Sequence, residues 1–241
     1  MREVHELLPT EGLLLLDIKL TTGQQLLAKT IEEFVLLGVI GIETRHFEDQ
    51  KVVVVSEKNF ENSYLKDYHN LFLASIREHY QAYSEVTAKN ALTPKKLIGS
   101  VRYKLDFNDK NYKFGHIYDR LKLWELAKNR FPHYYINKPL TRKGEELRSK
   151  LKGLIDSLDQ EVKTNKDKNR LSELSNGLGF NVILIPGVFK ELGQNEFDKP
   201  KYFVGPGLEI QNSFLQWEIL DRANLHVLEP ELFDLPDDID D

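Results

Sequence analysis

Apolar residues recur with helical spacing along much of the chain, and short β-branched runs interrupt them. The pattern predicts, in order, a short helix at 13–16, an amphipathic helix at 24–37 and a hairpin of strands at 39–44 and 51–56. Thr10 is a suitable N-cap for the first helix, and Gly38 is well placed to end the second. This order of helix, helix and hairpin is typical of a winged-helix unit.

A similar order follows. We expect helices at 65–83, from Thr93 and Pro94 to 101, and at 118–130, then a strand at 132–137 and a helix at 141–162 capped by Thr141. Beyond a charged loop at 163–170 come a helix at 171–178 and the run FNVILI (180–185), which fits a buried strand or an apolar docking segment.

These elements predict an α+β, mainly helical fold of tandem winged-helix-like units with a C-terminal extension. The expected parts are a first unit (1–62), a second unit (63–160), an extension that packs on the core (161–228) and a flexible acidic tail (229–241).

Composition agrees with a soluble globular protein, because 41% of the 241 residues are hydrophobic and 29% are charged. The chain has no cysteine, which excludes disulfides and thiolate metal sites. The longest apolar run, at 34–42, is too short to cross a membrane, and the N-terminus lacks a secretory signal. We therefore expect a cytoplasmic protein.

Motifs for catalysis are not evident. The seven histidines lack metal-ligand spacing, and Val182 stands where the dinucleotide fingerprint beginning at Gly177 needs its third glycine. The carboxylate pairs at 32–33 and 145–146 are expected on solvated helix faces. We accordingly expect no catalytic residues, no metal, no cofactor and no enzyme activity.

Charge is distributed unevenly. Between Lys95 and Lys152 there are sixteen Lys or Arg and six Asp or Glu, whereas 229–241 holds seven acids and no base. The candidate anion-binding residues are Arg120, Lys122, Lys128, Arg130, Lys138, Arg142, Lys143 and Arg148. They fit a solvated helix face, a nucleic-acid site, or a surface for proteins or lipids. The acidic tail could cover them.

Aromatic residues are interleaved with these cations, and such residues can stack on bases. Helical spacing more often indicates a core, so we expect Tyr118, Leu121 and Trp124 to be buried.

Two stretches together resemble a known family. LLLLDIKLTTGQQLLAKTIEEFVLLGVIGIE (13–43) and PLTRKGEELRSKLKGLIDSLD (139–159), followed by LSELSNGLGFNVI (171–183), resemble the cytoplasmic C-terminal region of bacterial predicted membrane proteins of unknown function. The resemblance spans Leu13 to Val182 and implies a tandem winged-helix-like cytosolic module, without supplying an activity or catalytic residues. The chain departs from that family in having no membrane span or preceding extracytoplasmic portion.

VVVVSEKNFENSYLKDYHNLF (52–72) more faintly resembles the Golgi phosphoprotein family of phosphoinositide-binding adaptors, whose basic-aromatic headgroup site has no match here. The leading hypothesis is a non-enzymatic binding or adaptor module that docks a protein partner. The alternatives are a nucleic-acid-binding winged-helix protein that uses the basic second unit, and a peripheral adaptor for anionic lipids.

Overall fold

The computed structural model describes residues 3–45, 50–55, 60, 64–83, 90–128, 139–164 and 167–185. This part is mainly helical and contains a two-stranded antiparallel sheet, which confirms the expected α+β, mainly helical class. Its elements are η1 (Val4–Glu6), α1 (Pro9–Leu16), α2 (Gly23–Leu36), β1 (Ile40–Arg45), β2 (Gln50–Val55), η3 (Asp67–His69), α3 (Asn70–Ala82), α4 (Pro94–Lys104), α5 (Asp109–Asn111), the π-helix η4 (Tyr112–Tyr118), α6 (Asp119–Leu123), α7 (Arg142–Lys163), α8 (Lys168–Leu178) and η5 (Gly179–Leu184). Within these ranges, no helix is both long and apolar enough to cross a membrane.

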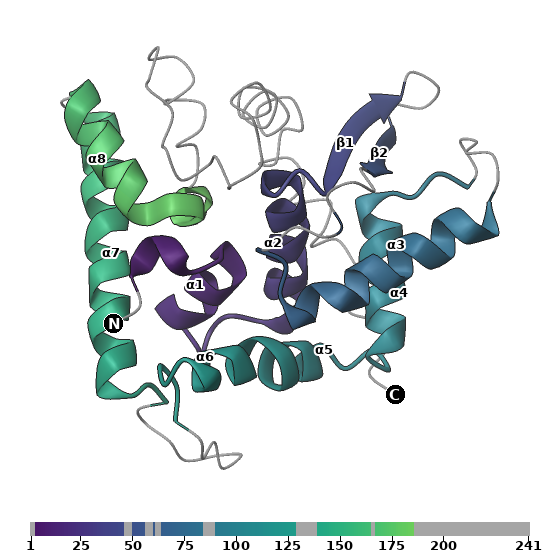
Figure 1. The fold of residues 1–241 in the computed structure, drawn as a ribbon, viewed down its shortest axis with the longest axis horizontal. Coiled ribbons are helices and arrows are strands. Elements are labelled where there is room, and N and C mark those ends of the chain that lie inside the picture. Colours follow the sequence, from purple (N-terminus) through teal and green to yellow (C-terminus); the bar gives the residue numbers. More distant parts are fainter. Residues whose placement is uncertain are drawn as a thin grey trace.

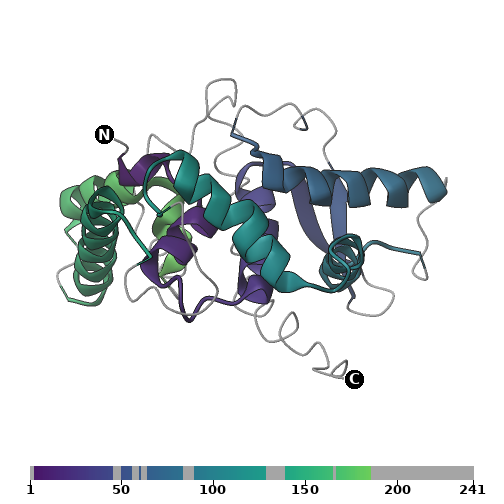
Figure 2. The same cartoon turned by 90° about the horizontal axis from the view of Figure 1, so that it is seen from below.

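Helix α2 lies in the middle of the molecule, with α1, α7 and α8 on one side and the hairpin, α3 and α4 on the other (Figures 1 and 2). Thr22 caps its N-terminus: the Thr22 hydroxyl accepts from the Gln25 N–H at 3.1 Å, and the Gln25 side chain accepts from the Thr22 N–H at 2.8 Å. Gly38 follows the helix with φ 66°, as predicted. Every side chain from Leu26 to Leu36 is buried, so α2 forms the centre of the core.

The predicted hairpin is confirmed to within one residue at each end. Strands β1 and β2 pair in antiparallel register from Ile40 opposite Val55 to Arg45 opposite Gln50. Outside the pair, the Val53 N–H donates to the Leu92 carbonyl at 2.7 Å, and the Tyr80 hydroxyl donates to the Val53 carbonyl at 2.8 Å. These bonds tie the hairpin to α3 and to the segment before α4.

Two further helix starts are confirmed by their caps. The Thr93 hydroxyl accepts from the Lys96 N–H at 3.1 Å, and Pro94 is the first helical residue of α4. At α7 the Thr141 hydroxyl accepts from the Gly144 N–H, also at 3.1 Å. Each cap satisfies an amide that has no partner within its own helix.

The helix expected at 118–130 is wrong at both ends. The helical stretch begins at Asp109, runs through α5 and η4, and ends at Leu123, because Glu125 adopts φ 57°. Apolar spacing could not reveal this end, since Glu125 is an unusual residue for the left-handed region. The strand expected at 132–137 lies outside the described residues, as does everything after 185.

Two more expectations are corrected. Thr10 is not an N-cap: α1 starts at Pro9 with Leu8 as its cap, and the Glu11 side chain accepts from the Leu8 N–H at 3.1 Å. Residues 180–184 of FNVILI belong to η5 and not to a strand, and Ile185 follows the helix. Its Asn181 amide donates to the Val4 carbonyl at 3.1 Å and to the Leu7 carbonyl at 2.9 Å, which fastens η5 to the N-terminal end of the chain.

The buried apolar residues of both expected units and of the extension belong to one hydrophobic cluster. Helix α7 packs against α1 and α8, and η5 packs against η1 and α1. The C-terminal elements therefore complete the core around α1 (Figure 1).

Candidate functional site

A buried carboxylate organises the centre of the molecule. Glu33, on α2, is fully buried and accepts hydrogen bonds from the Thr10 N–H, from the Tyr68 hydroxyl at 2.9 Å and from His69 Nε2 at 2.9 Å. His69 Nδ1 accepts from the Lys66 N–H at 2.7 Å, so the proton of the neutral ring is on Nε2, facing Glu33. These bonds join α1, α2 and η3 through one side chain.

The pKa values of the tyrosines beside Glu33 reflect this setting. Burial, reinforced by the Glu33 charge, raises the pKa of Tyr68 well above its usual value. Burial likewise raises the pKa of Tyr112, whose hydroxyl lies 2.7 Å from that of Thr30. Both tyrosines therefore remain neutral hydrogen-bonding groups.

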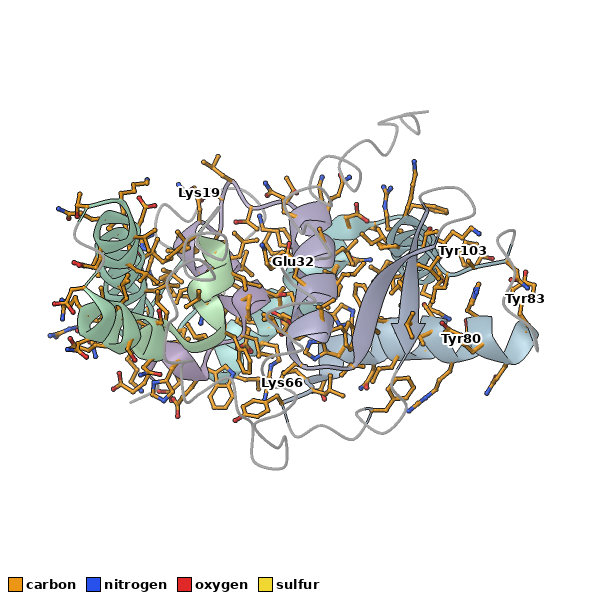
Figure 3. The ribbon with its side chains drawn as sticks, turned by 90° about the horizontal axis from the view of Figure 1, so that it is seen from above. Lys19, Glu32, Lys66, Tyr80, Tyr83 and Tyr103 are labelled. Carbon is orange, nitrogen blue, oxygen red and sulfur yellow. The ribbon has the colours of Figure 1, made fainter. Side chains whose placement is uncertain are left out.

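The expectation that residues 32 and 33 lie on a solvated helix face is wrong. Glu33 is fully buried, and the nearly buried Glu32 pairs with Lys29 at 2.7 Å (Figure 3 shows Glu32 on α2). The second pair behaves as expected in part: Glu146 is exposed and Glu145 is half-buried.

A second buried carboxylate connects the interior to the surface. Glu11 is fully buried, and the Arg120 Nε donates to it at 3.4 Å. The guanidinium carbon of Arg120 also lies 5.5 Å from the centre of the Trp124 ring, within the range of a cation–π contact. Arg120, the first of the predicted anion-binding residues, is thus engaged in positioning Trp124.

Trp124 stands on the turn that ends α6. The Glu125 N–H donates to the Lys122 carbonyl at 2.9 Å, and the Leu126 N–H donates to the Leu121 carbonyl at 2.8 Å. This is the Schellman arrangement, which usually has glycine where Glu125 stands. The turn leaves Leu123 72% exposed and Trp124 41% exposed.

The expected burial of three residues at this end is therefore only partly right. Tyr118 and Leu121 are buried, but Trp124 is not, because the helix ends at Leu123. The sequence signal that could have suggested exposure is the density of cations around Trp124.

The start of α7 packs closely on this turn. The Thr141 N–H donates to the Leu126 carbonyl at 3.0 Å, and the Thr141 hydroxyl donates to the Glu125 carbonyl at 2.6 Å. The Tyr118 hydroxyl donates to the Lys128 carbonyl at 3.1 Å. A Cβ added at Gly144 would lie 2.0 Å from the Leu126 carbonyl oxygen, so only glycine fits this approach.

We call the surface formed by Lys122, Leu123, Trp124, Lys128, Arg142 and Lys143 the basic-apolar corner. Four of the predicted cations lie on it, and Lys128 is exposed. Lys122 pairs with Asp119 and Lys143 with Glu125. Arg142 pairs with Glu146 at 2.9 Å. Exposed pairs of this kind are weak and can be exchanged for an acidic partner.

The remaining predicted cations are not on the corner. Arg148 pairs with Glu145 one turn further along α7, whereas Arg130 and Lys138 lie outside the described residues.

Arg142 and Lys143 stand at the N-terminal end of α7, where the helix dipole disfavours positive charge. Their position therefore costs helix stability instead of adding to it.

A second pair of exposed apolar residues, both of them aromatic, occurs at the other end of the same helical stretch. Asp106 and Phe107 have φ 52° and 55°, and Phe107 is 51% exposed beside Tyr103, which is 73% exposed. Their ring centres are 6.2 Å apart. Figure 3 shows Tyr103 at the end of the molecule away from α7, so this pair is separate from the basic-apolar corner.

Chemically reactive arrangements are few in this part of the chain. Burial lowers the pKa of Lys113, with Asp17 opposing the shift, and burial also lowers the pKa of His116. Among the described residues, no group of three or more His, Cys, Asp or Glu is placed to hold a metal ion.

No family model, curated protein or solved structure matches the chain.

Proposed function

We propose that this protein is a non-enzymatic binding module of winged-helix-like units whose basic-apolar corner docks an acidic, partly apolar segment of a protein partner. The observation that carries the proposal is the exposure of Leu123 and Trp124 on a turn without glycine, at which α6, the residues after it and the start of α7 bring four cations. Tryptophan is enriched among the residues that contribute most to protein interfaces. The cytoplasm is the proposed location.

The winged-helix part of the proposal is supported by element order. Helices α1 and α2 lead into the β1–β2 hairpin, as in a winged-helix unit. In the second half, α3, α4 and the stretch from α5 to α6 are followed by an antiparallel bridge between Ala127 and Leu140.

Positioning of the corner also supports docking. Arg120 is held by buried Glu11 and lies beside Trp124, so the indole is fixed before a partner arrives. A side chain that is already ordered loses less entropy on binding. Protein docking is favoured over nucleic acid because Leu123 offers an apolar contact beside Trp124.

The test compares two double variants in the full-length protein. Leu123→Ser with Trp124→Ser removes the two apolar side chains of the corner. Tyr103→Ser with Phe107→Ser is the matched control at the other exposed pair. Each protein is immobilised on a resin and incubated with an extract of its source cells. The proteins that it retains are quantified by mass spectrometry. Duplex DNA titrations at two salt concentrations and flotation with anionic liposomes are run in parallel.

We expect a set of proteins that the wild type and the control retain and the corner variant loses. Equal retention by all three proteins would refute the corner as the docking site. Salt-sensitive DNA binding, or flotation, that disappears in the corner variant would show that its ligand is nucleic acid or lipid instead.

A further inference from the structure

We infer that the acidic C-terminal segment of this chain, residues 229–241, docks on the basic-apolar corner and competes with the partner. The inference rests on the proposed function, because it assigns the same corner an occupant within the chain. Three observations carry it: the opposite charges of the segment and the corner, the apolar side chains present in both, and the length of chain that joins them.

The charges are complementary. Residues 229–241 contain seven acids and no base, whereas 119–128 and 139–152 together contain eight bases and four acids. The bases lie at the corner and along the first half of α7. The second half of α7, 153–163, has three acids and one base, so a segment bound there would meet repulsion. The docking position is thus limited to the corner end of the helix.

Apolar side chains accompany the acids in the segment. In ELFDLPDDID the residues Leu232, Phe233, Leu235 and Ile239 alternate with carboxylates. The corner presents the exposed Leu123 and Trp124 among its cations. A segment of this composition can bury apolar surface on these two side chains while its carboxylates replace Asp119 and Glu125 as partners of the lysines.

The covalent connection permits this contact. Residues 186–228 separate the segment from Ile185, and a chain of that length can span on the order of 100 Å. Ile185 follows η5, which packs against η1, α1 and α8. A tethered segment acts at an effective concentration that reaches the millimolar range for short flexible linkers and falls for longer ones. The tether therefore favours the chain's own segment over the same peptide free in solution at a lower concentration.

The experiment uses the full chain and a fluorescent synthetic peptide of residues 229–241, with fluorescence anisotropy as the readout. The wild type is compared with a tail-neutral chain in which the seven acids of 229–241 become amides (Glu→Gln, Asp→Asn). In the tail-neutral background, Lys122→Glu with Lys128→Glu reverses the charge of two of the four corner cations; this chain is the corner variant. Lys95→Glu with Lys110→Glu is the control, since both are exposed lysines outside the corner. Circular dichroism checks that every variant is folded.

We expect the tail-neutral chain to bind the peptide at least about tenfold more tightly than the wild type, whose own segment competes. Binding should fall steeply with salt, disappear in the corner variant and persist in the control. If the peptide binds the wild type and the tail-neutral chain equally, through Lys122 and Lys128, the internal competition is refuted and the docking site stands. If the peptide does not bind the tail-neutral chain, the inference is refuted, and the partner experiment alone decides the proposed function.

A second readout reports the internal contact directly. In a Trp217→Phe background, Trp124 is the remaining tryptophan of the two in the chain. Neutralising the tail should then shift Trp124 emission to longer wavelength, because the indole becomes more exposed to water. An unchanged emission maximum would contradict docking of the segment on Trp124.

Discussion

Two glycines of α7 should respond in opposite ways to the same substitution. At Gly144 an added Cβ would lie 2.0 Å from the Leu126 carbonyl oxygen and 2.9 Å from its carbonyl carbon. At Gly153 it would meet nothing within 4 Å. Alanine is the better helix former by about 1 kcal/mol, so helix propensity alone predicts that both Gly→Ala variants are stabilised.

The surroundings of Gly144 reverse that expectation. To relieve the contact, the start of α7 must move away from Leu126, which strains the 3.0 Å bond from the Thr141 N–H to the Leu126 carbonyl. Overpacking of this kind costs about 1–3 kcal/mol, and a lost hydrogen bond costs about 1 kcal/mol more. After subtracting the propensity gain, we expect Gly144→Ala to lower the free energy of unfolding by about 2 kcal/mol.

Gly153→Ala should raise the free energy of unfolding by up to about 1 kcal/mol. The two variants would then differ by about 3 kcal/mol, or roughly 6–12 °C in Tm for a protein of this size. Urea unfolding followed by circular dichroism measures the difference, and Trp124 emission in a Trp217→Phe background reports whether the corner has moved. If Gly144→Ala were as stable as Gly153→Ala, the close packing of α7 on the α6 turn would be refuted.

Three further predictions follow from the same structure. Glu33→Gln places an amide N–H2 against the donors that now face the carboxylate, so the free energy of unfolding should fall by about 3 kcal/mol. Urea titrations measure the change, and a loss below about 1 kcal/mol would contradict the hydrogen-bond network around Glu33. Glu125→Gly should stabilise the protein by about 1 kcal/mol by relieving φ 57°, whereas Glu125→Gln, which keeps the Cβ, should not; equal effects would show that the Lys143 pair and not the backbone is responsible. Burial lowers the pKa of His116 below its ordinary 6.5, so the unfolded chain binds more protons than the folded chain as pH falls through 6.5, and the free energy of unfolding decreases there. His116→Asn should reduce this decrease in unfolding curves measured at pH 7.5, 6.5 and 5.5. An unchanged dependence of the free energy of unfolding on pH would contradict the assignment.

Helix starts were predictable where a side chain caps them. Thr93 and Thr141 were expected at helix starts, and each accepts from an amide of the following turn, a local contact that depends on few residues. The hairpin was predictable because its β-branched run lies between polar segments.

Helix ends without glycine were not predictable. Glu125 ends α6 in the left-handed region, where a glycine would normally signal the stop. The burial of Glu33 was equally hidden, because its donors come from Thr10, Tyr68 and His69, far from it in the sequence or on other elements. Position along a helix says nothing of such partners. As a result, cations near the corner could be named from the sequence, but their arrangement around Trp124 could not.

Departures from local rules gather at the ends of one helical stretch. Among the described residues, the non-glycine positions with positive φ are Asp106, Phe107 and Glu125, and each stands beside an exposed apolar pair. At the Glu125 end two cations also oppose the dipole of α7, and buried Glu11 fixes Arg120 against Trp124. The positive φ values and the two cations cost stability, and the apolar pairs expose surface, whereas the Arg120 contacts hold Trp124 in place. Such features persist most readily where they serve binding, so the end that combines all of them is the stronger candidate for a docking surface.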